Sequence, residues 1–134
     1  MSAIKIRTAL EIALSSMTPS LITAWENMAF LPPDPSVPFQ VVTILFAEPA
    51  NPSFGDSFHR ENGYMQVKLL YPLKVGTAIV MARAEALRAL FYRGASFNYS
   101  GITVHINRTP EIAPGSNEGD HFGVPVKIRF YSDI

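Results

Sequence analysis

Residues 60–94 read RENGYMQVKLLYPLKVGTAIVMARAEALRALFYRG, and within this stretch the hydrophobic period changes from that of a strand to that of a helix. The first part alternates, and its apolar face consists of Met65, Val67, Leu69 and Tyr71. Pro72 closes this strand. After Gly76 a narrow stripe of helical spacing consists of Ile79, Ala82, Ala86 and Leu90. Gly94 ends the helix, because a left-handed residue costs least without a Cβ. The stretch predicts a helix docked closely on a sheet, with Arg83 and Arg88 outside the contact stripe.

The N-terminal part is predicted to be helical. Residues 1–17 carry a helical face made of Ile4, Ala9, Ile12 and Ala13, widened by Leu10 and Leu14. Thr18 and Pro19 suit a helix start, so a short second helix is expected over residues 19–26, with Leu21, Ile22 and Trp25 inward. Residues 28–38 contain closely spaced prolines, which remove hydrogen-bond donors and predict a connector.

Further strands are predicted around the central one. Residues 39–46, FQVVTILF, are apolar on both faces, which indicates a strand covered by the helices on one side and by something else, such as a neighbouring subunit, on the other. Residues 95–99 are expected to pair with 102–108 about the turn at Ser100-Gly101. The last strand spans residues 122–131, and its inward residues are Val124, Val126, Ile128 and Phe130. Pro125 lacks a donor and predicts an edge or a bulge there.

These elements indicate an α+β fold with one mixed or antiparallel sheet of about four strands and helices packed on one face. A length of 134 residues suits a single domain over 1–134. Its expected parts are N-terminal helices at 1–27, the Pro-rich connector at 28–38, and a sheet with one central helix at 39–134.

The composition argues against several classes of function. Eleven basic residues balance eleven acidic ones, whereas nucleic-acid binders usually carry a basic excess, so we expect no nucleic-acid sequence recognition. No stretch of about eighteen apolar residues occurs, so we expect no membrane partner. The chain has no cysteine, which suits the cytosol. Only 16% of its residues are charged, and a surface short of charge often has part of itself buried against a partner.

Phe54-Gly55-Asp56-Ser57 imitates the nucleophile block of GDS-type ester hydrolases. Such an enzyme needs a histidine held by an aspartate to activate the serine. The adjacent pair Asp120-His121 lacks the Asp-x-x-His spacing of that class. A small cytosolic hydrolase with a GDS-like serine is therefore a minor alternative, and a plain turn explains the same residues.

The sequence gives little support to a metal site or a phosphate site. His59, Glu61, Asp120 and His121 would suit zinc or manganese only if the two long loops that carry them converge. Arg83, Glu85 and Arg88 are expected to form a solvated or subunit-facing helix surface, with a phosphate site as the minority interpretation. Neither a P-loop nor a dinucleotide fingerprint occurs. We therefore expect no enzyme activity, no catalytic residue, no metal and no cofactor.

Several short motifs, taken in order, resemble the bacteriophage tail terminator family, which includes the minor tail protein U of lambda-like siphophages. They are Trp25-Glu26-Asn27, Phe30 with Pro32-Pro33, Pro38-Phe39-Gln40, Phe46-Ala47-Glu48-Pro49 with Asn51-Pro52, Arg60, Gly63 with Gln66-Val67, Tyr71-Pro72, Gly76, and Phe91 with Gly94. The match covers residues 21–94, and the C-terminal strands agree only in pattern. Order and spacing carry the resemblance.

The resemblance implies a structural phage protein that closes into a six-membered ring on the end of the finished tail tube. The ring would stop polymerisation and offer a surface for head–tail joining. Its partners would be further copies of itself, the tail tube protein and the head–tail connector protein. Its location would be the host cytoplasm during assembly and then the virion tail. A head-completion or connector adaptor protein of a phage is the alternative, since it shares the ring habit.

The long loop over residues 47–62 is the first candidate for contacts with the tube or with an adjacent subunit, because loops of this length are often functional. Its polar candidates are Glu48, Asp56, His59, Arg60 and Glu61. Arg83 and Arg88 are second-choice contacts. A solvated loop ordered by its own prolines remains the alternative.

Overall fold

The computed structural model describes residues 2–51 and 58–134 of the chain. Two helices occur in the described part, α1 (Ser2–Ser15) and α2 (Ala78–Leu90). The longer strands are β2 (Phe39–Phe46), β3 (Arg60–Pro72), β5 (Ile102–Ile106) and β8 (His121–Asp133). The shorter strands are β1 (Ile22–Ala24), β4 (Ser96–Tyr99), β6 (Glu111–Ile112) and β7 (Ser116–Glu118).

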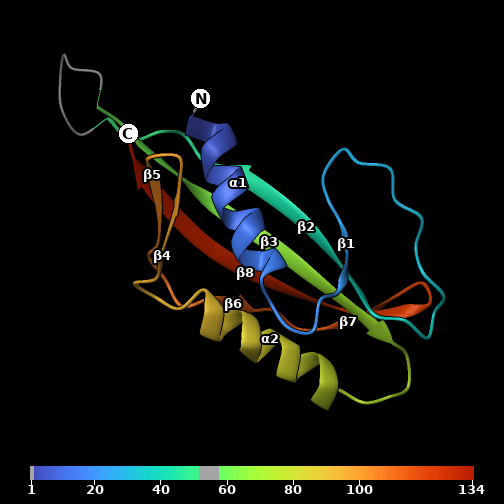
Figure 1. The fold of residues 1–134 in the computed structure, drawn as a ribbon. Coiled ribbons are helices and arrows are strands. Elements are labelled where there is room, and N and C mark those ends of the chain that lie inside the picture. The colour runs from blue at the N-terminus through green and yellow to red at the C-terminus, as the bar shows by residue number, and fades with distance from the viewer. Residues whose placement is uncertain (1, 52–57) are drawn as a thin grey trace.

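The strands form one mixed sheet in the order β1-β2-β3-β8-β5-β4. β1 runs parallel to β2, and the other pairs are antiparallel. β3 and β8 pair along their whole length, from Arg60 opposite Asp133 to Pro72 opposite His121. Along its other edge, β8 pairs with β5, β6 and β7 one after another (Figure 1). The β3–β8 pair is therefore the axis of the domain.

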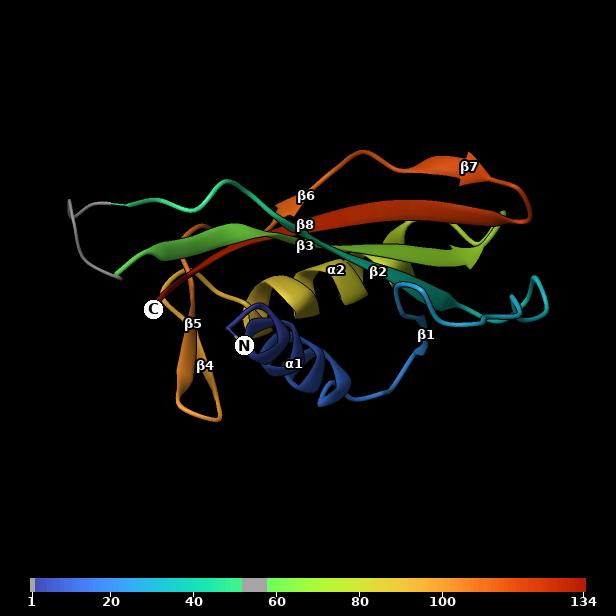
Figure 2. The ribbon, with the colours of Figure 1, turned by 90° about the horizontal axis from the view of Figure 1, so that it is seen from above.

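Both helices lie on the same side of this axis, as the view from above shows (Figure 2). The core lies between them and the sheet. Its largest fully buried side chains include Ile6, Leu10 and Leu14 of α1, Met65, Val67 and Leu69 of β3, and Phe130 of β8. Apolar burial of this kind stabilises the fold by about 1.5–3 kcal/mol for each large side chain. The expectation of an α+β fold with helices on one face is confirmed.

The central part of the chain agrees with the sequence analysis. The predicted inward residues of β3 and β8 are buried, and β2 has the predicted bounds. The hairpin of β4 and β5 turns at Ser100 and Gly101, which both have positive φ. Gly94 adopts φ 97°, which a residue with a Cβ rarely does, but it does not end α2 as expected, because the helix stops at Leu90 with Phe91 as its C-cap.

The expected number of about four strands is wrong, because the sheet has eight. No strand was predicted within residues 109–121, yet they contain β6 and β7, which pair with β8. Pro125 does not lie on an edge strand, since β8 is paired on both sides. The Pro125 carbonyl oxygen accepts a hydrogen bond from the Ala113 N–H at 2.9 Å. Pro125 therefore lies opposite the segment between β6 and β7, where β8 needs no N–H donor for strand pairing.

The second N-terminal helix is also wrong. Ile22–Ala24 form β1 and pair in parallel with Phe39, Gln40 and Val41 of β2. Leu21 and Trp25 do pack against the core, but Ile22 is 48% exposed. The sheet thus begins inside the segment 1–27 that was expected to be helical.

The inner face of α1 agrees in part with the expected one, since Ala9, Leu10, Ala13 and Leu14 are buried, whereas α2 packs on a different face. In α2 the buried apolar stripe consists of Val80, Ala84 and Leu87, continued by Phe91, whereas Ile79 is 58% exposed. This stripe also has helical spacing and contains larger side chains than the expected one, so its burial removes more apolar surface from water. In α1, Ile6 replaces the exposed Ile4 and Ile12 on the inner face. Within the described residues, no helix has the length and apolar character needed to span a membrane.

Candidate functional site: the open face of the sheet

Alternation along β3 and β8 leaves the face opposite the helices lined by polar and aromatic side chains. The outward residues of the two strands pair in register, as Tyr64 with Arg129 and Gln66 with Lys127. All four are partly exposed. Because successive residues of a strand point to opposite faces, the buried apolar residues that anchor the helices also position this open face.

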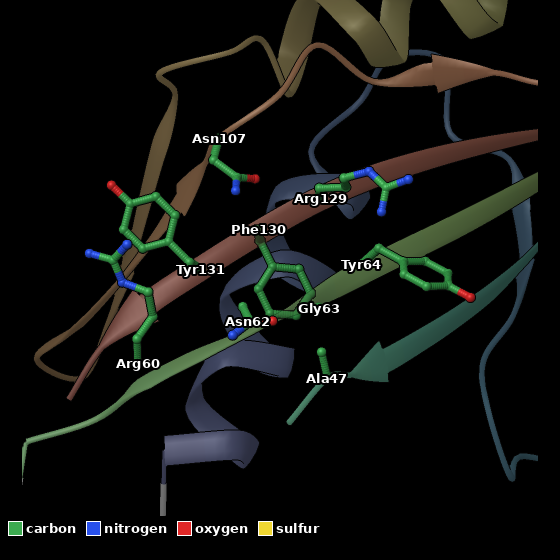
Figure 3. Close-up of a pocket in the computed structure, with 9 residues that line it drawn as sticks. All are labelled: Ala47, Arg60, Asn62, Gly63, Tyr64, Asn107, Arg129, Phe130 and Tyr131. Carbon is green, nitrogen blue, oxygen red and sulfur yellow. The ribbon is translucent and has the colours of Figure 1, made fainter. Parts of the chain in front are cut away.

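A shallow hollow of about 520 Å³ lies at the end of this face where β3 begins and β8 ends (Figure 3). It is lined by Ala47, Arg60, Asn62, Gly63, Tyr64, Asn107, Arg129, Phe130 and Tyr131. Segments far apart in the sequence meet here, and the loop after β2 leaves from the same end (Figure 1).

Arg60 and Asp133 face each other across the strand ends. The Arg60 Nε donates to one carboxylate oxygen at 2.6 Å and its Nη2 to the other at 3.0 Å. This bond lowers the pKa of Asp133 below its usual value and raises that of Arg60. The guanidinium also lies 4.3 Å from the centre of the Tyr131 ring, which in turn stacks on His105. Arg60, Asp133, Tyr131 and His105 thus form one oriented, solvent-accessible cluster, called here the Arg60 group.

Most of the loop candidates gather beside this group. A ring nitrogen of His59 lies 3.1 Å from the Glu61 carboxylate, and the His59 carbonyl accepts from the Ile134 N–H at 2.9 Å. Glu48 is exposed, and its carbonyl accepts from Asn62. The structure therefore brings Glu48, His59, Arg60 and Glu61 to one end of the sheet. Asp56 lies outside the described residues.

The basic side chains farther along the open face each have a partner. Lys68 pairs with Glu118 at 3.0 Å, and Arg129 lies 3.8 Å from Glu111. Lys127 lies 4.5 Å from the centre of the Tyr64 ring. Such paired charges leave no continuous basic stripe along the described face for a phosphate backbone.

The second-choice contacts lie elsewhere, on α2. Arg83 is 7% exposed, so the interpretation of a solvated helix surface is wrong for it. Its Nη1 donates to the Pro19 carbonyl at 2.5 Å. Arg88 is partly exposed, donates to the Pro110 carbonyl at 3.1 Å and lies 3.6 Å from Glu85. The structure does not bring either arginine to the Arg60 group.

Among the described residues, the features weighed for metal binding do not come together. Ser57 and the rest of the Gly-Asp-Ser block lie outside the described residues. His59 and His121 stand at opposite ends of the β3–β8 pair, so the two loops do not bring the proposed metal ligands together. Among the residues that the structure describes, no group of three or more His, Cys, Asp or Glu is placed to hold a metal ion.

Sequence reasoning missed Tyr64, Lys127, Arg129, Tyr131 and Asp133 as members of a surface. The signal was present, because Lys127, Arg129 and Tyr131 alternate with the apolar core residues Val126, Ile128 and Phe130. The register of β3 against β8, which places Arg60 opposite Asp133, could not be predicted from the sequence.

A model of the family described as phage tail terminator protein matches residues 5–130 of this chain. The search of curated proteins found no match to this chain. One solved structure is similar over 100% of this chain and over 96% of the solved chain, with a TM-score of 0.74 and 24% sequence identity. That identity shows a shared fold only.

Proposed function

Because this chain belongs to the phage tail terminator protein family, we propose that it caps the completed tail tube as an oligomeric ring. The ring ends tube polymerisation and provides the surface for head–tail joining. Membership of the family, which the sequence resemblance predicted, gives the chain a structural role in a phage tail. The proposal adds that the chain forms a ring, caps the tube and binds partner proteins.

One observation carries the proposal most strongly, the extent of the family match. Residues 5–130 include nearly all of both helices and every strand up to most of β8. The likeness therefore concerns a whole folded domain and not one motif.

The distribution of exposed apolar side chains supports a ring. Leu31 is 88% and Met28 66% exposed on the Pro-rich connector, while Ile79 and Val75 are 58% and 50% exposed at the start of α2. A closed cyclic ring needs two different surfaces on each subunit, because one face of a subunit meets another face of its neighbour. Apolar side chains at separate positions suit such contacts. We propose a hexamer.

The open end of the sheet supplies the surface proposed for the tail tube. The Arg60–Asp133 pair with Tyr131 combines a held guanidinium and aromatic area, which are enriched at protein interfaces. Glu48, His59 and Glu61 add polar groups at its rim. The opposite side of the ring is then left for the head–tail connector protein. Assembly takes place in the host cytoplasm, and the ring stays in the virion tail.

Deletion of the gene from the phage tests the proposal. We expect headless tails longer than normal by electron microscopy, since nothing stops addition of tube subunits, and complementation by the wild-type gene should restore a uniform length. Tails of normal length in the deletion strain would overturn the cap. Separate pull-downs with tail tube protein and with connector protein distinguish this role from a connector adaptor, which would bind only the connector.

A further inference from the structure

An open groove lies along α1, beside the residues that follow β1. It consists of two shallow hollows of about 500 and 560 Å³, and Glu11 and Trp25 line both of them. Ile12 lines one hollow and Met28 the other, and these two side chains are 56% and 66% exposed. Exposed apolar area beside a partly exposed tryptophan is typical of a surface that another protein covers.

Glu11 is a carboxylate for which the single subunit provides no ion-pair partner. The nearby Arg7 binds Glu26 at 2.8 Å, and among the described residues no cation is in ion-pair contact with Glu11. Partial burial raises the pKa of Glu11, and Arg7 offsets this effect only in part. The charged form of Glu11 is therefore costly in the isolated subunit, and a cation from another molecule would relieve that cost.

A basic hollow on another side of the subunit carries charges of the opposite sign. Arg93 follows α2 and Arg108 follows β5, and with Asn107 and Thr109 they line a hollow of about 430 Å³. Both arginines are exposed, and neither forms an ion pair within the described part of the chain. Tyr92, which precedes Arg93, is 58% exposed. Tyrosine and arginine are enriched among the residues that dominate binding at protein interfaces.

The groove and the basic hollow lie on opposite sides of α1. β1, which leads into Trp25, is on one side of this helix, and the β4–β5 hairpin, which Arg93 precedes and Arg108 follows, is on the other (Figure 1, Figure 2). A cyclic ring needs such an arrangement, because each subunit meets its two neighbours through two different surfaces. The start of α2 also exposes Ile79, but residues 74–82 contain one basic side chain, Lys74.

We propose that the groove of one subunit receives the basic side of a second copy of this chain. Glu11 binds Arg93 of the neighbour, and the neighbour's Tyr92 packs against Trp25 and Met28. Repeated around one axis, this contact closes the ring. The inference rests on the proposed function and names the two subunit surfaces that meet. It uses no member of the Arg60 group, so its failure leaves the proposed tail cap untouched.

The absence of cysteine from the chain makes cross-linking a direct test. We would combine Met28→Cys with Tyr92→Cys, treat the purified full chain and finished phage tails with a short bis-maleimide, and separate the products by denaturing electrophoresis. We expect a ladder from dimer upwards, because every subunit then joins two neighbours. Each single variant should remain monomeric, and an equal mixture of the two single variants should give dimers only.

Met28→Cys combined with Ile79→Cys is the matched control, because it pairs the same groove with the start of α2. It should give no ladder. A ladder from this control and none from Met28→Cys with Tyr92→Cys would overturn the proposal, and equal ladders from both pairs would do the same by showing unspecific contact. The absence of both ladders from tails of normal length would overturn this subunit contact, whereas the tail length of the deletion strain tests the cap independently.

Charge reversal in the background of Met28→Cys and Tyr92→Cys tests the ionic part of the contact. Glu11→Arg and Arg93→Glu should each lower the ladder yield by at least about tenfold, because like charges then meet. An equal mixture of the two should restore the ladder, since a reversed groove meets a reversed basic side and an unchanged groove meets an unchanged one. Glu85→Arg, an exposed reversal on α2, should leave the yield unchanged. Full yield in Glu11→Arg, or no recovery in a mixture of variants that are folded by circular dichroism, would overturn the pairing.

Discussion

The two faces of the β3–β8 pair use alternate residues of the same strands for different purposes. On the covered face, Met65, Val67 and Leu69 are fully buried beneath the helices. On the open face, Tyr64, Lys127 and Arg129 remain partly exposed and contact one another or nearby acids. Stability therefore comes mainly from one face, and the other carries the surface that we propose for recognition. Substitutions at neighbouring positions can separate the two.

The largest expected effect comes from Phe130, which is 1% exposed and packs edge to face against Phe46. Phe130→Ala should lower the free energy of unfolding by about 3–5 kcal/mol, through lost burial and the cavity left behind. The adjacent Arg129→Ala should change it by less than about 0.5 kcal/mol. Urea denaturation followed by circular dichroism measures both. Comparable losses in the two variants would mean that the faces do not divide their roles.

Gly63 tests how closely β2 and β3 approach at the end of the sheet that carries Arg60 and Asp133. A Cβ added there would lie 2.0 Å from the Leu45 carbonyl oxygen, so the backbone must move. Gly63→Ala should cost about 1–3 kcal/mol of unfolding free energy, even though alanine reduces the freedom of the unfolded chain. The neighbouring Asn62→Ala should cost less than about 1 kcal/mol. A neutral or stabilising Gly63→Ala in thermal unfolding would show that β2 gives way easily.

The strands of this axis were predictable because each carries its own period. Residues 64–71 and 122–131 alternate so regularly that their buried face follows from the sequence. The family resemblance added a functional context that no single residue supplied. The open face was also implied by the alternation, but it was not interpreted as a surface.

The remaining elements depend on pairings between distant residues. Leu21, Ile22 and Trp25 fit a helical spacing, yet β1 forms because Ile22–Ala24 lie along the edge of β2. β6 and β7 are two and three residues long and lack an apolar pattern, so only the free edge of β8 makes them strands. In α2 two stripes share the helical period, and only the sheet selects Val80 and Leu87.

Glu26 lies beside β2, where its carboxylate accepts a hydrogen bond from the Ile44 N–H at 2.7 Å. Partial burial favours its neutral form, but hydrogen bonds from Arg7 and from the Ile44 N–H outweigh burial and lower its pKa. A carboxylate with a lowered folded-state pKa stabilises the protein above its ordinary value of 4.5, and this stability is lost as the pH falls through the folded-state pKa. Glu26→Gln should therefore lower the Tm by a few degrees at pH 7 and reduce the loss of Tm on acidification to pH 3.

Glu11 provides the matched control, because burial raises its pKa. Its charged form is disfavoured in the folded state, so Glu11→Gln at pH 7 should leave the Tm unchanged or slightly raised. If both glutamines lowered the Tm equally at pH 7, loss of charge near Arg7 would explain the effect and the hydrogen bond to β2 would not.

The smallest expected effect on stability, and a large one on recognition, comes from Arg60→Gln. Arg60 is solvent-exposed, and its pair with Asp133 is screened, so the Tm should not change measurably. Binding to tail tube protein should fall several-fold, because glutamine keeps much of the length but loses the charge and the planar fork above Tyr131. Arg88→Gln on α2 removes a similar charge away from the sheet end. Reduced capture of tube protein by Arg88→Gln with normal capture by Arg60→Gln would move the recognition surface to α2, and the open face would then lose its proposed role.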